Sequence, residues 1–247
     1  MKIAILSDIH GNMEALVAVM SDLREQECDK IFVLGDYAMA GPEPNDVVQF
    51  FMRKIENDNI KLIQGNTDFM ISHFSDEIYE TVRGKAPVMA AALKNDFKVI
   101  GDMERNFLKN LPQQLELEEG GIKILLVHGS PRRNNEDILP NTSLNEVEEM
   151  LASVDSNVVL CGHTHIPCGF QTRKKQTVVN VGSVGRPFTP EAKACYLIMT
   201  IDNGNYSFQH RFVDYDNETA SKKLANRNFW GSDKLAKTLL NPKERHF

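Results

Sequence analysis

Three short apolar segments in the early part of the chain each stop abruptly at polar residues. They span residues 2–7, 30–34 and 60–63, and each has the length of a buried β-strand. The first two are followed by apolar residues at helical spacing, within residues 13–23 and 45–55. Strands that alternate with helices predict an α/β fold with a largely parallel sheet and right-handed crossovers.

The pattern then changes. Residues 71–111 lack clear strands and are predicted to be a helical insertion that forms a lid or wall, with helices at 89–93 and 103–111. Strands return after this insertion, and they are expected at residues 114–117, 122–127, 158–160, 177–181, 195–201 and 206–212, with one further helix at 144–151. Gly120-Gly121 and Asn203-Gly204 are typical of hairpin turns between neighbouring strands.

The end of the chain reads as a helical segment over about residues 216–240, with an interruption at 229–231. No long linker or change of composition divides the sequence. We therefore expect a single domain over residues 1–247 that carries the insertion and this C-terminal helical segment.

Composition narrows the classes of partner. The formal net charge of -6 argues against binding to a nucleic-acid duplex, which needs a clustered positive surface. No apolar run approaches the roughly 20 residues that span a bilayer, and the four cysteines form no CxxC pair. These features predict a cytoplasmic protein that does not insert into membranes.

Potential metal ligands gather at the ends of the predicted strands. The polar residues found there carry oxygen or imidazole donors, and they are Asp8, His10, Asp36, Asn66, Asp68, His128, His163 and His165. The carboxyl ends of parallel strands meet at one edge of a sheet, so residues distant in sequence converge there. Mixed carboxylate and imidazole donors suit Mn, Fe, Co, Ni or Zn better than Mg or Ca.

Two of these motifs have chelating geometry. Asp8 and His10 are separated by one residue, so in an extended segment both side chains project to the same side. His163 and His165 repeat this spacing. The sequence therefore predicts a metal site assembled from distant motifs.

The ordered set of motifs resembles the calcineurin-like metallophosphoesterase superfamily. The family pattern is D-x-H, G-D, G-N-x-D/E, H and G-H-x-H, and this chain reads D-I-H, G-D, G-N-T-D, H-G-S and G-H-T-H between Asp8 and His165. Residues 128–132 and 180–188 are similar to the small bacterial branch of the family. That branch includes phosphodiesterases and diadenosine tetraphosphate hydrolase-like proteins.

The resemblance implies a fold, two metal sites and an activity. The fold would be a four-layer α/β/β/α sandwich of two mixed β-sheets flanked by helices. One divalent ion would be held by Asp8, His10, Asp36 and His165, and the other by Asp36, Asn66, His128 and His163, with Asp36 bridging. The implied reaction is hydrolysis of a phosphate ester by a metal-bridging hydroxide, with Asp36, Asn66, Asp68 and His128 as the residues that act in catalysis.

One departure from the family bears on the substrate. Many members have histidine where this chain has Thr67, and that histidine helps the leaving group depart. Its absence favours a small phosphodiester or dinucleoside polyphosphate, with Arg132 or Arg186 as a clamp for a substrate phosphate. Thr67 itself is either a substrate contact or a simple turn residue, and Arg132 is either a clamp or a surface residue. A broad phosphomonoesterase and a non-catalytic metal-binding scaffold of the same fold are the alternatives.

Overall fold

The computed structural model describes residues 1–242 of the chain. Its strands are β1 (Lys2–Leu6), β2 (Lys30–Val33), β3 (Ile60–Leu62), β4 (Gln114–Glu119), β5 (Ile122–Val127), β6 (Val158–Cys161), β7 (Cys168–Gln171), β8 (Thr177–Asn180), β9 (Ala194–Asp202) and β10 (Asn205–Val213). Its helices are α1 (Met13–Glu25), α2 (Pro44–Met52), α3 (Asn66–Ser72), α4 (Asp76–Lys85), α5 (Pro87–Val99), α6 (Asp102–Asn110), α7 (Leu144–Met150), α8 (Asn217–Ala225) and α9 (Ser232–Leu240).

Within the described residues the strands form two five-stranded sheets, ordered β10-β9-β1-β2-β3 and β4-β5-β6-β8-β7. Strands β1, β2 and β3 are parallel in the first sheet and β5, β6 and β8 in the second, as the strand and helix alternation predicts. The other strands pair antiparallel, and two hairpins account for β4 and β10. Their two-residue turns, Gly120-Gly121 and Asn203-Gly204, have the positive φ angles of tight hairpin turns. Both sheets are therefore mixed.

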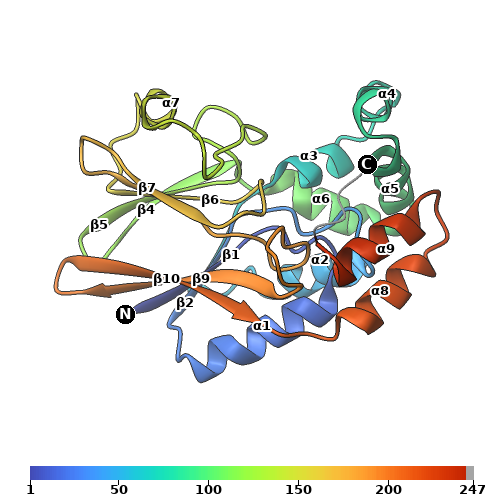
Figure 1. Ribbon diagram of the computed structural model, residues 1–247, viewed down its shortest axis with the longest axis horizontal. Helices are drawn as coiled ribbons and strands as arrows, with labels where there is room; N and C mark the ends of the chain where they lie inside the picture. The colour runs from blue at the N-terminus through green and yellow to red at the C-terminus, as the bar shows by residue number, and fades with distance from the viewer. Residues whose placement is uncertain (243–247) are drawn as a thin grey trace.

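Three apolar clusters separate four layers. Strand β1 shows why: Ile3 and Ile5 pack between the two sheets, whereas Ala4 and Leu6 face the helices, because side chains alternate along a strand. The third cluster joins the second sheet to α7 through Val127, among others. Figure 1 shows α7 outside the second sheet, with α1, α2, α8 and α9 on the opposite side of the molecule. The predicted α/β/β/α sandwich is confirmed.

Three elements are not among those expected from the sequence: helix α3, helix α4 and strand β7. Helix α4 has no buried residue, so its sequence lacks a strong apolar stripe, although its N-cap Ser75 accepts a hydrogen bond from the backbone of Ile78. Strand β7 is a short edge strand that alternates between half-buried and exposed residues and contains Gly169. Helices α5 and α6 are confirmed, and α5 is longer than expected. No helix within residues 1–242 is long and apolar enough to cross a membrane.

A buried ion pair ties the C-terminal helices to the helices of residues 71–111. Arg227 lies between α8 and α9 and is 2.5 Å from Asp96 on α5, and the two side chains are 9% and 0% exposed. Both residues also hold the loop after β2: Arg227 donates to the Gly41 carbonyl at 2.7 Å, and Asp96 accepts from the Ala40 amide at 2.9 Å. The position of this loop therefore depends on two distant parts of the chain.

Replacing Arg227 by methionine should destabilise the protein by about 3–5 kcal/mol, because the Asp96 carboxylate would remain buried without its cation. Denaturant unfolding monitored by circular dichroism measures the loss. The double variant Arg227→Met/Asp96→Asn should recover part of it, since no unpaired charge is left. A single-variant loss below about 1 kcal/mol would mean that the pair does not stabilise the fold.

Candidate metal centre

The predicted ligands come together at one edge of the two sheets. Asp8 and His10 follow β1, Asp36 follows β2, and Asn66 begins α3 after β3. From the second sheet, His128 follows β5, and His163 and His165 follow β6. All of these strands are the parallel ones, so their carboxyl ends meet, as expected from the sequence.

Three imidazoles are fixed by backbone carbonyls. The Nδ1 atoms of His10, His128 and His165 lie 2.7–2.8 Å from the carbonyl oxygens of Met39, Leu34 and Arg186. A carbonyl only accepts, so each Nδ1 carries the hydrogen. In the neutral ring Nε2 then presents a lone pair, which is the arrangement of histidines that bind metals.

The first group of donors consists of Asp8, His10 and His165, all buried. The Nε2 atoms of His10 and His165 are only 3.1 Å apart, and Asp8 Oδ1 lies 3.2 Å from the latter. Asp8 Oδ1 has no hydrogen-bond partner among the described residues. Neutral imidazoles would place two lone pairs against each other beside an unpaired carboxylate oxygen, which is costly in a buried site. A cation at this point satisfies all three atoms, so the residues fit a divalent metal.

The second group consists of Asp8, Asp36 and His128. His128 Nε2 lies 3.4 Å from Asp36 Oδ2 and 2.9 Å from Asn66 Oδ1, which adds an amide oxygen to the donors. Asp36 Oδ2 is also 3.7 Å from His10 Nε2 in the first group. Both carboxylates thus face both groups, and the bridging role of Asp36 stays a prediction.

His163 is the predicted ligand that joins neither group. Its side chain is 19% exposed, and its Nε2 lies 3.3 Å from Asp137 Oδ1. The His163 and His128 rings are near one another, with centroids 5.3 Å apart. Its backbone amide donates to Asp8 Oδ2 at 3.0 Å, so the loop that carries His163 also fixes Asp8.

The ligand loops have unusual backbone conformations. Asp8, His10, Asp36, His163 and His165 all have φ between 47° and 66°, a region that residues with a side chain rarely occupy. Such conformations persist only when the surroundings enforce them, and they cluster at functional sites.

Glycines in the motifs provide the necessary space. A Cβ on Gly65 would lie 2.1 Å from Asp36 Oδ1, and one on Gly162 would lie 2.6 Å from Asp8 Oδ2. The glycines that precede Asn66 and His163 are therefore required by the packing of the carboxylates.

The buried charges shift each other's pKa. Burial and the neighbouring His165 lower the pKa of His10 to about 4, so its ring is neutral at pH 7. Burial alone would lower the pKa of His128, but the carboxylates of Asp36 and Asp8 raise it to about 10. Burial alone would raise the pKa of Asp8, yet His165 and His128 hold it well below its usual range. The site therefore favours ionised carboxylates and strongly attracts positive charge.

The Asp68 side chain binds the backbone next to Asp36. Its carboxylate accepts from the amides of Asp36, Tyr37 and Gly65 at 2.7, 3.0 and 2.8 Å. Burial and the Asp36 carboxylate raise the pKa of Asp68 to about 7. From the first turn of α3, Asp68 therefore holds the loop that carries Asp36.

The proposed substrate residues occupy different environments. The Thr67 amide donates to Asp36 Oδ1 at 2.9 Å, and its hydroxyl donates to the Ala38 carbonyl at 3.2 Å. Arg186 is 5% exposed, and its charge contributes to lowering the pKa of His10. Arg132 pairs with Glu136 through two contacts of 3.0 and 2.7 Å, and Arg133 pairs with the same carboxylate.

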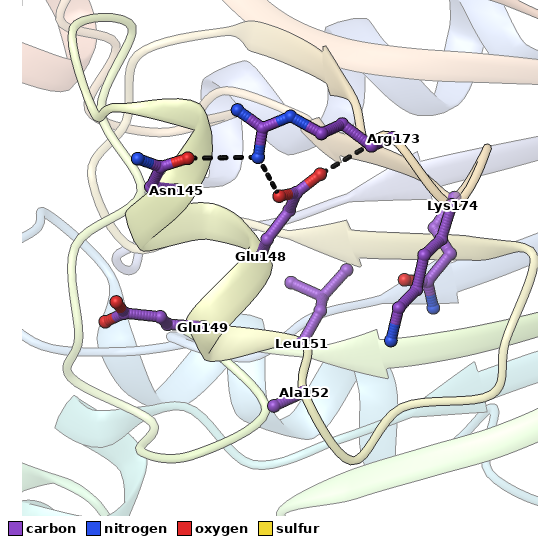
Figure 2. Close-up of a pocket in the computed structure, with 8 residues that line it drawn as sticks. Asn145, Glu148, Glu149, Leu151, Ala152, Arg173 and Lys174 are labelled. Atoms are coloured by element: carbon purple, nitrogen blue, oxygen red, sulfur yellow. Dashed lines mark hydrogen bonds and ion pairs between the residues drawn. The ribbon is translucent and has the colours of Figure 1, made fainter.

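A hollow of about 550 Å³ lies away from these residues, between α7 and the turn before β8. Figure 2 shows Arg173 reaching across to Glu148 and Asn145, with Lys174 on the opposite side. No predicted site residue lines it. We therefore do not assign the phosphate chemistry to this hollow.

Sequence reasoning missed the residues that support the site. Asp137 faces His163, and Asp96 and Arg227 hold the loop whose Met39 carbonyl orients His10. None of them lies in a motif with recognisable spacing. An acidic residue can pair with many distant basic residues, so the sequence does not indicate that Asp96 pairs with Arg227.

Comparisons with known proteins agree with this geometry. Residues 1–204 match the model of the calcineurin-like phosphoesterase superfamily domain. An uncharacterised protein of Methanocaldococcus jannaschii is 29% identical over 238 residues, which cover 90% of this chain and 91% of that protein.

Two solved structures are similar over nearly their whole length. A hypothetical protein from Pyrococcus horikoshii OT3 has a TM-score of 0.85 at 25% identity, with 99% of each chain covered. A metallophosphoesterase from Sphaerobacter thermophilus has a TM-score of 0.76 at 24% identity, with 97% of this chain and 98% of that chain covered. The chain therefore belongs to the calcineurin-like phosphoesterase superfamily, and it is a metal-dependent phosphoesterase.

Proposed function

We propose that this protein hydrolyses small phosphodiesters or dinucleoside polyphosphates with two divalent metal ions. The observation that carries the proposal is the meeting of the Nε2 atoms of His10 and His165 at 3.1 Å beside the unpartnered Asp8 oxygen. A divalent cation would satisfy all of the buried donors in this arrangement. The donor types favour Mn, Fe, Co, Ni or Zn over Mg or Ca.

The proposed ligand sets are those that the family resemblance implies, and they differ from the two donor groups because they share Asp36 rather than Asp8. One ion would be held by Asp8, His10, Asp36 and His165, and the other by Asp36, Asn66, His128 and His163. Divalent ions at such sites lower the pKa of water and offset the charge on a phosphate. For His163 the proposal requires its ring to exchange the Asp137 contact for the metal.

The residues around the proposed metals orient a ligand and offset the charge of a phosphate. Asp68 fixes the Asp36 loop through three amide hydrogen bonds, so the carboxylate is already in place before substrate arrives. Arg186 is buried at the site and adds positive charge near His10, which favours a phosphate. Arg132 lies in the loop after His128, so it would contact a substrate phosphate farther from the metals than Arg186 does. It shares the carboxylate of Glu136 with Arg133.

The preference for diesters or anhydrides is supported by Thr67. Thr67 lies in the first turn of α3, and its hydroxyl donates to the Ala38 carbonyl in the loop after β2. A threonine hydroxyl is in any case a poor acid. An ester whose leaving group is already stable as an anion does not need a proton from this position.

The alternatives stay within the same fold. A broad phosphomonoesterase would use the same metals, and a metal-binding scaffold would keep the ligands without turnover. We favour the diesterase because no predicted ligand is missing and because no proton donor stands at Thr67. A cytoplasmic location stays a prediction from the cysteine pattern.

Asp36→Asn should reduce hydrolysis of bis-p-nitrophenyl phosphate by at least about 100-fold, since it removes a charged donor that both proposed ligand sets contain. Rates are measured with added Mn(II) or Ni(II). The matched control is Asp155→Asn, which makes the same change at an exposed carboxylate that pairs with Lys123. Equal rates for wild type and Asp36→Asn would remove the catalytic assignment.

Metal-loaded protein should contain two divalent ions per chain, measured by elemental analysis after dialysis. His165→Ala should lower that content, whereas His210→Ala should not, because His210 belongs to neither donor group and its Nε2 bonds to the Asn180 carbonyl. Saturating metal should also stabilise the fold, by about 2.7 kcal/mol at a hundred times the dissociation constant. Identical metal content in the two variants would refute the ligand set.

Rates should fall steeply as the leaving group becomes more basic. In a series of aryl methyl phosphates, we expect the p-nitrophenyl ester to react at least about 100-fold faster than the unsubstituted phenyl ester, because this chain supplies no acid at Thr67. The measurement is kcat/KM across the series at constant metal concentration. A nearly flat dependence would show that another group protonates the leaving oxygen.

A further inference from the structure

A hollow lies beside the proposed metal ligand Asn66. It has a volume of about 310 Å³ and lies between helices α3 and α4 and residues 134–135, which follow the His128 loop. Both helices lie on the same side of the molecule in Figure 1. The unpredicted helix α4 thus forms one wall of a space that opens beside the site.

The lining of this hollow suits a neutral organic group. Phe69, Ile78 and Val82 supply carbon surface, and Asn134 and Asn135 add side-chain amides that donate and accept. Among the described residues that line it, Glu77 is the only one with a charge, and that charge is negative. A second phosphate would be repelled here, whereas an uncharged ring with polar edges would be accommodated.

A neighbouring hollow has the opposite character. It measures about 190 Å³ and is lined by His128, Arg132 and Arg133. The two guanidinium groups share the single carboxylate of Glu136, so positive charge is in excess. Asn134 lines both hollows, and the ligands Asn66 and His128 that border them are 2.9 Å apart. A phosphate in the hollow beside His128 and an organic group in the hollow beside Asn66 would therefore be adjacent parts of one substrate.

We propose that the hollow between α3 and α4 binds a planar, nucleobase-like group of the substrate and so sets its specificity. This inference rests on the proposed function, because it takes the metals as the place of the phosphate. The volume suits one base rather than a whole dinucleotide, since pockets for drug-sized ligands begin at about 300 Å³. The flat ring would lie against Phe69 and Ile78, and the asparagine amides would reach its polar edge.

Binding to Mn(II)-loaded protein tests this without turnover. Isothermal titration calorimetry compares adenosine and guanosine 5′-monophosphates with ribose 5-phosphate, which lacks the base, and with inorganic phosphate. We expect at least one nucleotide to bind about tenfold or more tightly than ribose 5-phosphate. Equal affinity of wild-type protein for the nucleotides and ribose 5-phosphate would overturn the proposal.

Two variants locate the effect. Thr81→Trp fills the hollow from an exposed position on α4, and Met70→Ala removes part of its wall on α3. Both should remove most of the advantage of the nucleotide while leaving the affinity for inorganic phosphate unchanged. Glu80→Trp is the matched control, because Glu80 is exposed on the same helix and does not line the hollow.

The outcomes separate the two proposals. If neither hollow variant alters the nucleotide preference, or if both weaken inorganic phosphate equally, the hollow does not hold the base. If base-dependent binding is present and phosphodiesters are not hydrolysed, the proposed function fails and the binding site stands. If phosphodiesters are hydrolysed without base-dependent binding, only the present inference fails.

Discussion

The metal centre is organised around buried acceptor atoms that face one another and that a cation would satisfy. The two Nε2 atoms 3.1 Å apart, together with a buried carboxylate oxygen, form a cluster of acceptors in the interior of the protein. Such a cluster is unfavourable unless a cation occupies it. The surrounding backbone holds this cluster in place. Carbonyls accept from the histidine rings, the His163 amide donates to the Asp8 carboxylate, and the ligand residues have positive φ angles.

Much of this arrangement could be predicted from the sequence, because it follows from local chemistry. Apolar strands that end in polar residues predict both the parallel strands and the edge at which ligands meet. The motif order then indicated the family and its four layers. The glycines at positions 65 and 162 belong to those motifs because the packing against Asp36 and Asp8 leaves no room for a side chain.

The features that could not be predicted depend on tertiary contacts, which produce no regular spacing of residues in the sequence. Helix α4 covers little apolar surface, so its sequence carries only a weak helical spacing of apolar residues. The helix nevertheless lines the hollow beside Asn66. The orientation of Thr67 toward the Ala38 carbonyl is set by the left-handed loop after β2, which sequence alone does not reveal. His163 lies beside Asp137 although its motif indicated only a metal ligand. In each case tertiary packing decided between local alternatives.

The pair formed by Asp96 and Arg227 couples parts of the chain that the family pattern does not link. The match to the family ends at residue 204, before Arg227, whereas Asp96 lies inside it. A relative that loses the arginine keeps a lone acid in its interior unless the acid changes as well. The two positions are therefore expected to vary together among homologues, and a C-terminal segment exchanged between relatives should function only when the matching residue on α5 is exchanged with it.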